Sequence, residues 1–380
     1  MRTLSSSEDT EHEVMEAGAE VTGIFLFLFS AMLLVEVLRH YKFFDLIRRW
    51  LYSKGFRDRK QFVAICFISF FLSAILDNLT TTLIMINVAM RFFEGRNRII
   101  AAAGIVVAAN AGGAFSPIGD VTTIMLWVAG KFTATEIILN TFLPSLVSFA
   151  VTIFFLARLI KGNSVDSTEE IEIYLSRSEK VVIAMSLGCF ALPLVATMLD
   201  LPPFLGLMGG LGVVWLTVEQ LKGHTNHETH LQVDIEVLLK EVEYASLAFF
   251  AGILLSVDAL NALGVLQQSA DLLLGDDPSN GRIAATMVGL GWLSAVVDNV
   301  PLTALAIDAI PTENSGLWSL LAFTVGTGGS HLIVGSAAGV VAMSKVKELT
   351  SIAYIKHATI PVFFGYVAGV GVWGVQQLIV

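Results

Sequence analysis

Charged residues are scarce in this sequence. Asp, Glu, Lys and Arg make up 15% of its 380 residues, whereas an ordinary soluble domain carries about 25%. The mean hydropathy is +0.73, and several apolar runs approach the roughly 20 residues that a helix needs to cross a bilayer. This composition excludes a soluble globular protein. It predicts an all-α polytopic membrane protein whose partner is the lipid bilayer. Composition does not identify the membrane, since a bacterial inner membrane and a plastid envelope would both suit this protein.

Cysteines and targeting signals are also scarce. Cys66 and Cys189 lie far apart within apolar runs, so we expect buried thiols rather than a disulfide or a metal pair. Residues 1–19 form a polar, acidic tail with the features of neither a secretory signal nor a transit peptide, and we expect it to be disordered or an amphipathic lead-in. A polar loop, which we interpret as solvated, contains His224, His227 and His230. No nucleic-acid partner is expected.

One phrase occurs twice in the sequence. Residues 73–80 read SAILDNLT and residues 294–301 read SAVVDNVP. Each copy places an Asp-Asn pair in the middle of an apolar stretch. An Asp near the bilayer centre costs about 2.5–3.5 kcal/mol on insertion scales, so such residues are rare and usually functional. The two copies therefore indicate two halves of one ion site.

Each Asp-Asn pair interrupts a run that is too short to form two full spans. The arms predicted around the first pair, residues 61–76 and 79–93, have about 15 residues each, or roughly 23 Å of helix. The second pair lies between arms at 283–297 and 300–310. Two short arms joined at a polar tip predict a re-entrant helical hairpin in each half of the chain.

The flanking charges indicate that the two hairpins open on opposite faces of the membrane. Basic residues flank the first hairpin, which places its flanks inside by the positive-inside rule. The flanks of the second hairpin are acidic apart from Arg282, which places them outside. This is an inverted-topology repeat, an arrangement typical of secondary transporters. We assign residues 20–160 to the first transport repeat and 244–380 to the second, with a polar tail at 1–19 and, at 161–243, a linker containing two transmembrane helices and a polar loop.

Each repeat contains a second interruption. Residues 112–120 read GGAFSPIGD and residues 327–336 read TGGSHLIVGS. Glycine and proline prevent a regular helix here, so we expect a broken transmembrane helix in each repeat. Broken helices leave backbone carbonyls without partners, and hard cations such as Na⁺ prefer oxygen ligands. The two hairpin tips and the two breaks are therefore expected to meet around an oxygen-lined cation site.

The candidate ion- and proton-binding residues lie mostly at these interruptions. The principal candidates are Asp77, Asn78, Thr81, Asp120, Asp298 and Asn299. Of these, Na⁺ is expected at Asp77, Asn78, Asp298 and Asn299. A second set contains Glu36, Asp258, Ser116, Thr303, Ser330, His331 and Ser336. Removal from water favours the protonated form of a carboxyl group, which binds Na⁺ poorly. Na⁺ and H⁺ therefore compete for one site, and competition combined with alternating access gives antiport.

Four phrases carry a resemblance to a known family. They are SAILDNLTTTLIM at 73–85, NAGGAFSPIGDVTTIMLW at 110–127, SAVVDNVPLTA at 294–304 and GTGGSHLIVGSAAGV at 326–340. With them the chain resembles the NhaD-type sodium/proton antiporters of the ion transporter superfamily. The resemblance implies exchange of Na⁺ or Li⁺ for H⁺, a two-hairpin fold, no cofactor and a homodimer. It assigns functional roles to Asp77, Asn78, Asp298, Asn299 and Asp120. Family members carry helices before the counterpart of Val21, which this chain is expected to lack.

Other functions are compatible with the pattern. One is an anion transporter of the same superfamily, for carboxylates or arsenite, although two acidic tips would repel an anion by on the order of several kcal/mol in a low-dielectric site. Another is an intramembrane aspartyl enzyme, in which two carboxylates about 3 Å apart share a proton, or a non-transporting membrane scaffold. Each acid could also serve only as a partner for the interrupted backbone, and His331 as a packed core histidine. The Asn and Thr residues beside the acids favour a cation transporter that is not an enzyme.

Overall fold

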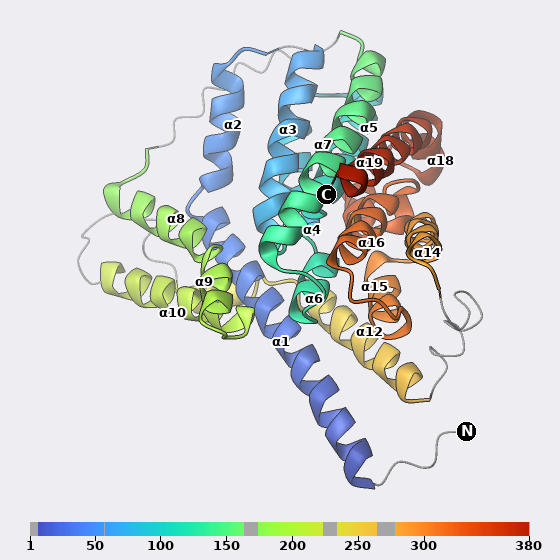
Figure 1. Ribbon diagram of the computed structural model, residues 1–380. Coiled ribbons are helices and arrows are strands. Elements are labelled where there is room, and N and C mark those ends of the chain that lie inside the picture. Colours follow the sequence, from blue (N-terminus) through green and yellow to red (C-terminus); the bar gives the residue numbers. More distant parts are fainter. Residues whose placement is uncertain (1–6, 57, 163–173, 223–233, 264–277, 380) are drawn as a thin grey trace. The chain divides into compact units, whose positions relative to one another are not determined.

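The computed structural model describes residues 7–56, 58–162, 174–222, 234–263 and 278–379 (Figure 1). Within these ranges every regular element is a helix, so the prediction of an all-α protein is confirmed. Six of the helices are long and apolar enough to cross a membrane, or seven if α8 (Arg177–Cys189) and α9 (Leu192–Met198), bent by 42°, are counted as one span. The three histidines of the polar loop at 223–233 and the acidic flank at 264–277 lie outside the described residues.

The chain divides into two compact units. Unit 1 contains Met1–Phe43 and Tyr174–Gln268, and unit 2 contains Phe44–Ile173 and Ser269–Val380. These units are defined by which parts of the chain pack together. The segments predicted from the sequence are repeats instead, and their boundaries remain a prediction. Cys66 in unit 2 and Cys189 in unit 1 are both free and buried, as expected.

Unit 1 is built around its first helix. Its helices are α1 (Ser7–His40), α8, α9, α10 (Pro203–Lys222), α11 (Ile235–Leu239) and α12 (Tyr244–Ala262), and α1 packs against α8, α10, α11 and α12. Helix α1 begins at Ser7, so of the two alternatives expected for residues 1–19, disorder or an ordered lead-in, the described part of this segment is helical. The short helix α11 lies where only a polar loop was expected.

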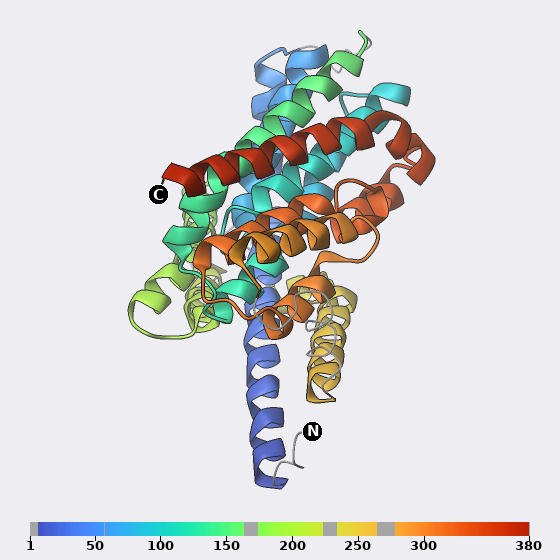
Figure 2. The same ribbon diagram turned by 45° about the vertical axis from the view of Figure 1, so that its right-hand side comes forward.

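Unit 2 contains two similar sets of helices. The first set is α3 (Asp58–Leu76), α4 (Asn78–Ala89), α5 (Gly95–Gly113), α6 (Val121–Val128) and α7 (Ala134–Leu159). The second is α14 (Asn280–Leu293), α15 (Asn299–Ala309), α16 (Ser315–Gly328), the short helix η1 (Ile333–Gly335), α17 (Ala337–Lys345), α18 (Ser351–Tyr354), η2 (Ile355–Thr359) and α19 (Ile360–Ile379). The amphipathic helix α2 (Phe43–Ser53) precedes both sets and was not predicted. Figure 2 shows α19 lying across α7, against which it packs.

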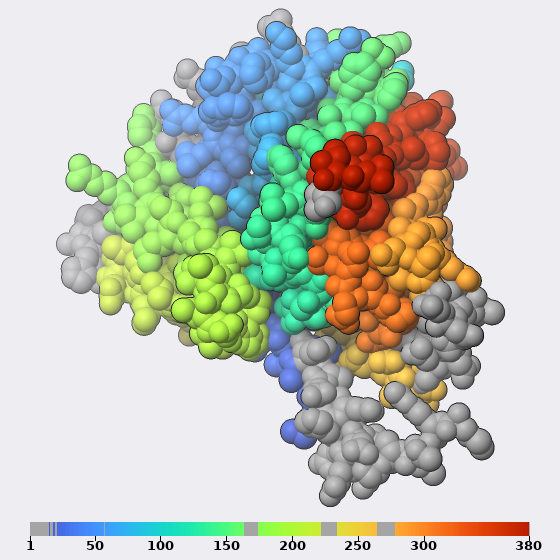
Figure 3. Space-filling view, viewed as in Figure 1, coloured from blue at the N-terminus to red at the C-terminus, as the bar shows by residue number. Residues whose placement is uncertain are grey.

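The core of unit 2 consists of the two helices that end at the breaks. In α5 all residues from Ile100 to Gly113 are buried, and in α16 all residues from Gly316 to Gly328 are buried. Small residues allow this close packing: a Cβ atom at Gly112 would collide with the carbonyl oxygen of Phe70 in α3, and one at Gly328 would collide with that of Gly291 in α14. On the face seen in Figure 3, the blue-to-green and orange-to-red halves of this unit meet along a packed seam.

The short helix that follows each break packs against the other set of helices. After its break the first set continues as α6, which packs against α15 and α16 of the second set, and after its break the second set continues as α17, which packs against α4 and α5 of the first. Each break is therefore held beside the hairpin tip of the other set. This packing positions the candidate site.

Three element boundaries differ from the sequence prediction. Helix α3 begins at Asp58 and has 19 residues, long enough for a full span, so a re-entrant path for the first hairpin remains a prediction. Helix α14 ends at Leu293, because the chain turns over residues 294–298 before the second tip. The last span contains a π-helical segment at η2, which ends two residues before Pro361, whose missing N–H interrupts the regular hydrogen-bond ladder.

Candidate cation site

The aspartates of the two hairpin tips cap the helices that follow them. Asp77 precedes α4, and its carboxylate accepts hydrogen bonds from the backbone N–H and the hydroxyl of Thr80, both at 2.8 Å. Asp298 precedes α15 and accepts one bond from the backbone N–H of Val300 at 3.1 Å. Such carboxylates satisfy N–H groups that have no partner within the helix. Both tip aspartates are partly exposed.

The asparagines next to these aspartates converge on a third acid. Nδ2 of Asn78 donates to Oδ2 of Asp120 at 2.9 Å, and Nδ2 of Asn299 donates to the same oxygen at 3.2 Å. Asp120 is 2% exposed and precedes α6, at the end of the first break. One buried carboxylate oxygen thus receives a donor from each hairpin tip, because α6 packs against α15 and because α5, which precedes the first break, packs against α4.

Asn110 connects this centre to the second break. Its Oδ1 accepts a hydrogen bond from Nδ2 of Asn78 at 3.2 Å. Its Nδ2 donates to Oγ of Ser330 at 2.9 Å and to Oγ of Ser336 at 3.0 Å. Asn110 is fully buried and was not among the predicted site residues. The available signal was its position, since it is the one amide in the apolar run that leads into Gly112.

The charges around Asp120 are all negative among the described residues. The charges of Asp298 and Asp77 both act on Asp120, and no lysine or arginine within the described ranges forms an ion pair with it. No group of three or more His, Cys, Asp or Glu side chains in these ranges is arranged to hold a metal ion. A cation at Asp120 would therefore take its other oxygen ligands from amides, hydroxyls and backbone carbonyls.

The remaining polar candidates of unit 2 have different surroundings. Thr81 is fully buried and its hydroxyl has no hydrogen-bond partner among the described residues. The hydroxyl of Thr303 donates to the carbonyl of Asn299 at 2.9 Å, and Ser116 accepts from the N–H of Ile118 at 3.4 Å within the first break. Among these three candidates, Thr81 alone has a hydroxyl without a partner in the described ranges, whereas Thr303 and Ser116 support local backbone.

His331 lies in the second break as a packed residue. Its Nδ1 is 2.9 Å from the carbonyl oxygen of Gly328, and its ring stacks on Trp292 and meets Tyr366 edge-on. The Nε2 atom is buried without a partner among the described residues. These aromatic contacts match the expected alternative of a packed core histidine.

Two candidates, Glu36 and Asp258, belong to unit 1. Glu36 forms an ion pair with Arg39 at 2.5 Å, and Arg39 also pairs with Glu241 at 3.0 Å. Asp258 is partly exposed on α12. The structure therefore gathers Asn78, Asp120, Asn299, Ser330 and Ser336 at one centre within unit 2, whereas Glu36 has its own partner within unit 1.

Comparison with protein families identifies a transporter family. Residues 7–328 match the family described as citrate transporter (CitMHS). This range covers most of the chain, including both hairpins and the first break.

Comparison with known proteins finds sodium/proton antiporters. The chain is 34% identical over 383 residues to sodium/proton antiporter 2 of Arabidopsis thaliana, covering 97% of this chain and 89% of the relative. It is 34% identical over 379 residues to the Na⁺/H⁺ antiporter NhaD of Alkalimonas amylolytica, covering 93% and 77%. The match to sodium/proton antiporter 1 of Arabidopsis thaliana, at 33% identity, covers 97% of this chain but 64% of the relative, so the chain spans less than two thirds of that protein.

Proposed function

We propose a function for this chain from its family: the chain belongs to the citrate transporter (CitMHS) family of multi-pass membrane transporters and, within it, to the group of the NhaD antiporters. The proposed function is the exchange of Na⁺ or Li⁺ for H⁺. In this proposal two inverted repeats give alternating access to one site in unit 2, and the functional protein is a homodimer. The relatives named as sodium/proton antiporters support the substrates. The geometry of the site supports the mechanism.

The observation that carries the proposal is the environment of Asp120. Its carboxylate is buried and receives amide donors from both tips, but within the described ranges it has no basic partner. A buried charge without a counter-ion is costly. Asp120 is therefore stable in two conditions, with a bound cation or with a bound proton, and each condition excludes the other.

This exclusion leads to exchange. A Na⁺ ion that leaves Asp120 on one side of the membrane leaves a buried negative charge, which a proton neutralises before the site turns to the other side. A change in the charge of the Asp120 carboxylate alters a hydrogen bond to each hairpin, because Asn78 and Asn299 donate to the same oxygen. Asp77 and Asp298 add negative charge that attracts the cation to the site.

Anion transport is the second candidate, since the matching family is described as citrate transporter. The charges disfavour it: an anion at this centre would meet Asp120, Asp77 and Asp298 without a basic side chain from the described residues to balance them. An intramembrane aspartyl enzyme is disfavoured as well, because the family and its relatives are transporters and because the carboxylates of Asp77 and Asp298 each cap a helix.

The test measures proton movement in everted vesicles that contain the full chain. A Na⁺ or Li⁺ pulse is expected to discharge a preformed pH gradient, and labelled citrate or arsenite is expected not to accumulate. The matched control is Asp45→Asn on α2, which neutralises a partly exposed acid paired with Arg48 at 3.3 Å and should leave the exchange rate unchanged. Accumulation of citrate without Na⁺-dependent proton movement would establish the anion transporter instead.

A further inference from the structure

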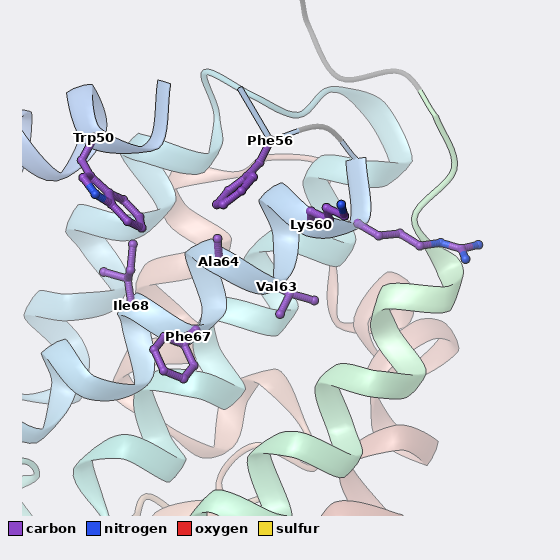
Figure 4. Close-up of a pocket in the computed structure, with 8 residues that line it drawn as sticks. Trp50, Phe56, Lys60, Val63, Ala64, Phe67 and Ile68 are labelled. Atoms are coloured by element: carbon purple, nitrogen blue, oxygen red, sulfur yellow. The ribbon is translucent and has the colours of Figure 1, made fainter. Parts of the chain in front are cut away.

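An apolar groove with a basic end lies between α2 and α3, away from the residues of the cation site. It is lined by Trp50, Phe56, Arg59, Lys60, Val63, Ala64, Phe67 and Ile68. Figure 4 shows Trp50 and Phe56 facing Ala64 and Ile68 across the groove, with Lys60 near the end where α3 begins. The groove continues along α2, where Leu46 and Ile47 line a second hollow with Trp50 and Ile68.

The apolar part of this surface extends along α3 in one direction only. Val63, Phe67, Phe71 and Ile75 are 42%, 51%, 39% and 40% exposed. They are spaced four residues apart and therefore share one face of the helix. From Val63 to Ile75 the stripe covers about 18 Å at helical rise. The basic end precedes this stripe, so the surface is charged at one end and apolar along the rest.

The charge at that end is positive and available. Lys60 is exposed and makes no ion pair among the described residues. Among the described residues, the guanidinium of Arg59 makes only two hydrogen bonds, both long at 3.4 Å, to the carbonyls of Arg158 and Ile160. Lys54 adds a third cation, with its Nζ 5.4 Å from the ring of Trp50. Residues 44–60 carry six basic and two acidic residues in the sequence, so an anionic group is favoured here.

We propose that this groove binds one anionic phospholipid, whose phosphate contacts Arg59 and Lys60 and whose acyl chain follows the stripe from Val63 to Ile75. A lipid fits because it has the same order of chemistry, a charged head followed by an apolar chain. Trp50 is the side chain expected at the boundary between head and chain, since tryptophan favours the membrane interface. A zwitterionic lipid lacks the net negative charge that the basic end selects.

Native mass spectrometry of the full chain tests the proposal. After removal of bulk lipid, the wild type is expected to retain one phosphatidylglycerol and no phosphatidylcholine. The double variant Arg59→Gln/Lys60→Gln is expected to bind phosphatidylglycerol about 30-fold more weakly. The matched control is Arg177→Gln/Lys180→Gln, which removes the same charges at the start of α8, a helix outside this groove, and should bind like the wild type. Equal retention of both lipids by the wild type, or unchanged binding in the groove variant, would overturn the proposal.

A second measurement locates the acyl chain. Phosphatidylglycerol with brominated acyl chains, added at a limiting amount, is expected to quench part of the tryptophan fluorescence of the wild type, and Trp50→Phe is expected to remove that part. Inorganic phosphate should cause no change in fluorescence and should not displace the lipid. Quenching that is the same in Trp50→Phe, displacement by phosphate, or occupation of the groove by a second copy of the chain without lipid would each contradict a lipid in this groove.

Discussion

The two halves of unit 2 share a backbone arrangement but differ in charge. Ser73 before the first tip donates to the carbonyl of Ala109 at 2.7 Å, and Ser294 before the second tip donates to the carbonyl of Val325 at 2.9 Å. Both carbonyls lie shortly before a break. In contrast, the first break ends in Asp120 and the second in Ser336. The equivalent serine contacts hold both breaks in place. Only the first break ends in an acid, Asp120, so the two breaks together have one carboxylate.

The two tips differ as well. The first hairpin turns at one residue, Asp77. Its φ of +72° lies in a region that residues other than glycine rarely adopt. The second hairpin spreads its turn over residues 294–298, and Asp298 has an ordinary φ of −51°. Asp77 also accepts two hydrogen bonds where Asp298 accepts one. The first tip is therefore the more constrained of the two.

The strongest test of the charge difference replaces the acid of the first break. Asp120→Asn keeps an oxygen that can accept from Asn78 and Asn299 but cannot alternate between a proton and a cation. We expect Na⁺-dependent proton movement to fall at least about 100-fold, whereas Ser336→Ala should retain measurable exchange. Membrane insertion and the unfolding temperature of both variants serve as controls. Exchange at the wild-type rate in Asp120→Asn would remove this residue from the mechanism.

Replacement of either tip asparagine should weaken apparent Na⁺ affinity, and by more at Asn78 than at Asn299. Each donates to Asp120, and a hydrogen bond to a charged group contributes about 1.5–3 kcal/mol. We expect Asn78→Ala and Asn299→Ala to weaken apparent Na⁺ affinity by between about ten-fold and 100-fold. The effect of Asn78→Ala should be larger, because its bond is shorter and because it also leaves Oδ1 of Asn110 without this donor. The half-saturating Na⁺ concentration in the vesicle assay measures both, and equal values would contradict the asymmetry.

Substitution by asparagine can separate the negative charge of the tip aspartates from their role as helix caps. Asn is about as good an N-cap as Asp, so Asp77→Asn and Asp298→Asn should leave the unfolding temperature unchanged while removing one negative charge each. If these charges attract the cation, exchange should slow by about ten-fold in either variant, which corresponds to about 1.4 kcal/mol. Unchanged exchange with unchanged stability would assign these residues to capping alone.

The shared backbone arrangement gives the smallest expected effect. Ser73→Ala and Ser294→Ala each remove one buried hydrogen bond, so each should lower the free energy of unfolding by about 1 kcal/mol, with similar values for the two. Thermal unfolding in detergent measures this change, and exchange should continue in both variants. A much larger loss at one serine would show that the two halves are not held by equivalent contacts.

Much of this molecule could be predicted because local sequence has local consequences. Apolar runs between charged flanks predict helices, and Asp-Asn pairs or Gly-rich phrases within them predict interruptions, since a polar or flexible residue disturbs the helix where it occurs. The tips at Asp77 and Asp298 and the break before Asp120 were found in this way. The family resemblance agrees with the relatives that the chain matches.

The centre of the site depended on packing between residues far apart in the chain. The sequence predicted the cation at Asp77, Asn78, Asp298 and Asn299, with Asp120 as a further candidate, and the prediction did not include Asn110. Only the packing of α6 and α17 against the opposite sets of helices brings Asn78, Asn299 and Asn110 around Asp120 and its hydrogen-bond network. The sequence by itself determined that the apolar runs are interrupted at the Asp-Asn pairs and the Gly-rich phrases, since an interruption depends on neighbouring residues. The tertiary structure decided which of the interrupted ends meet, since that depends on how α5 and α16 pack in the core.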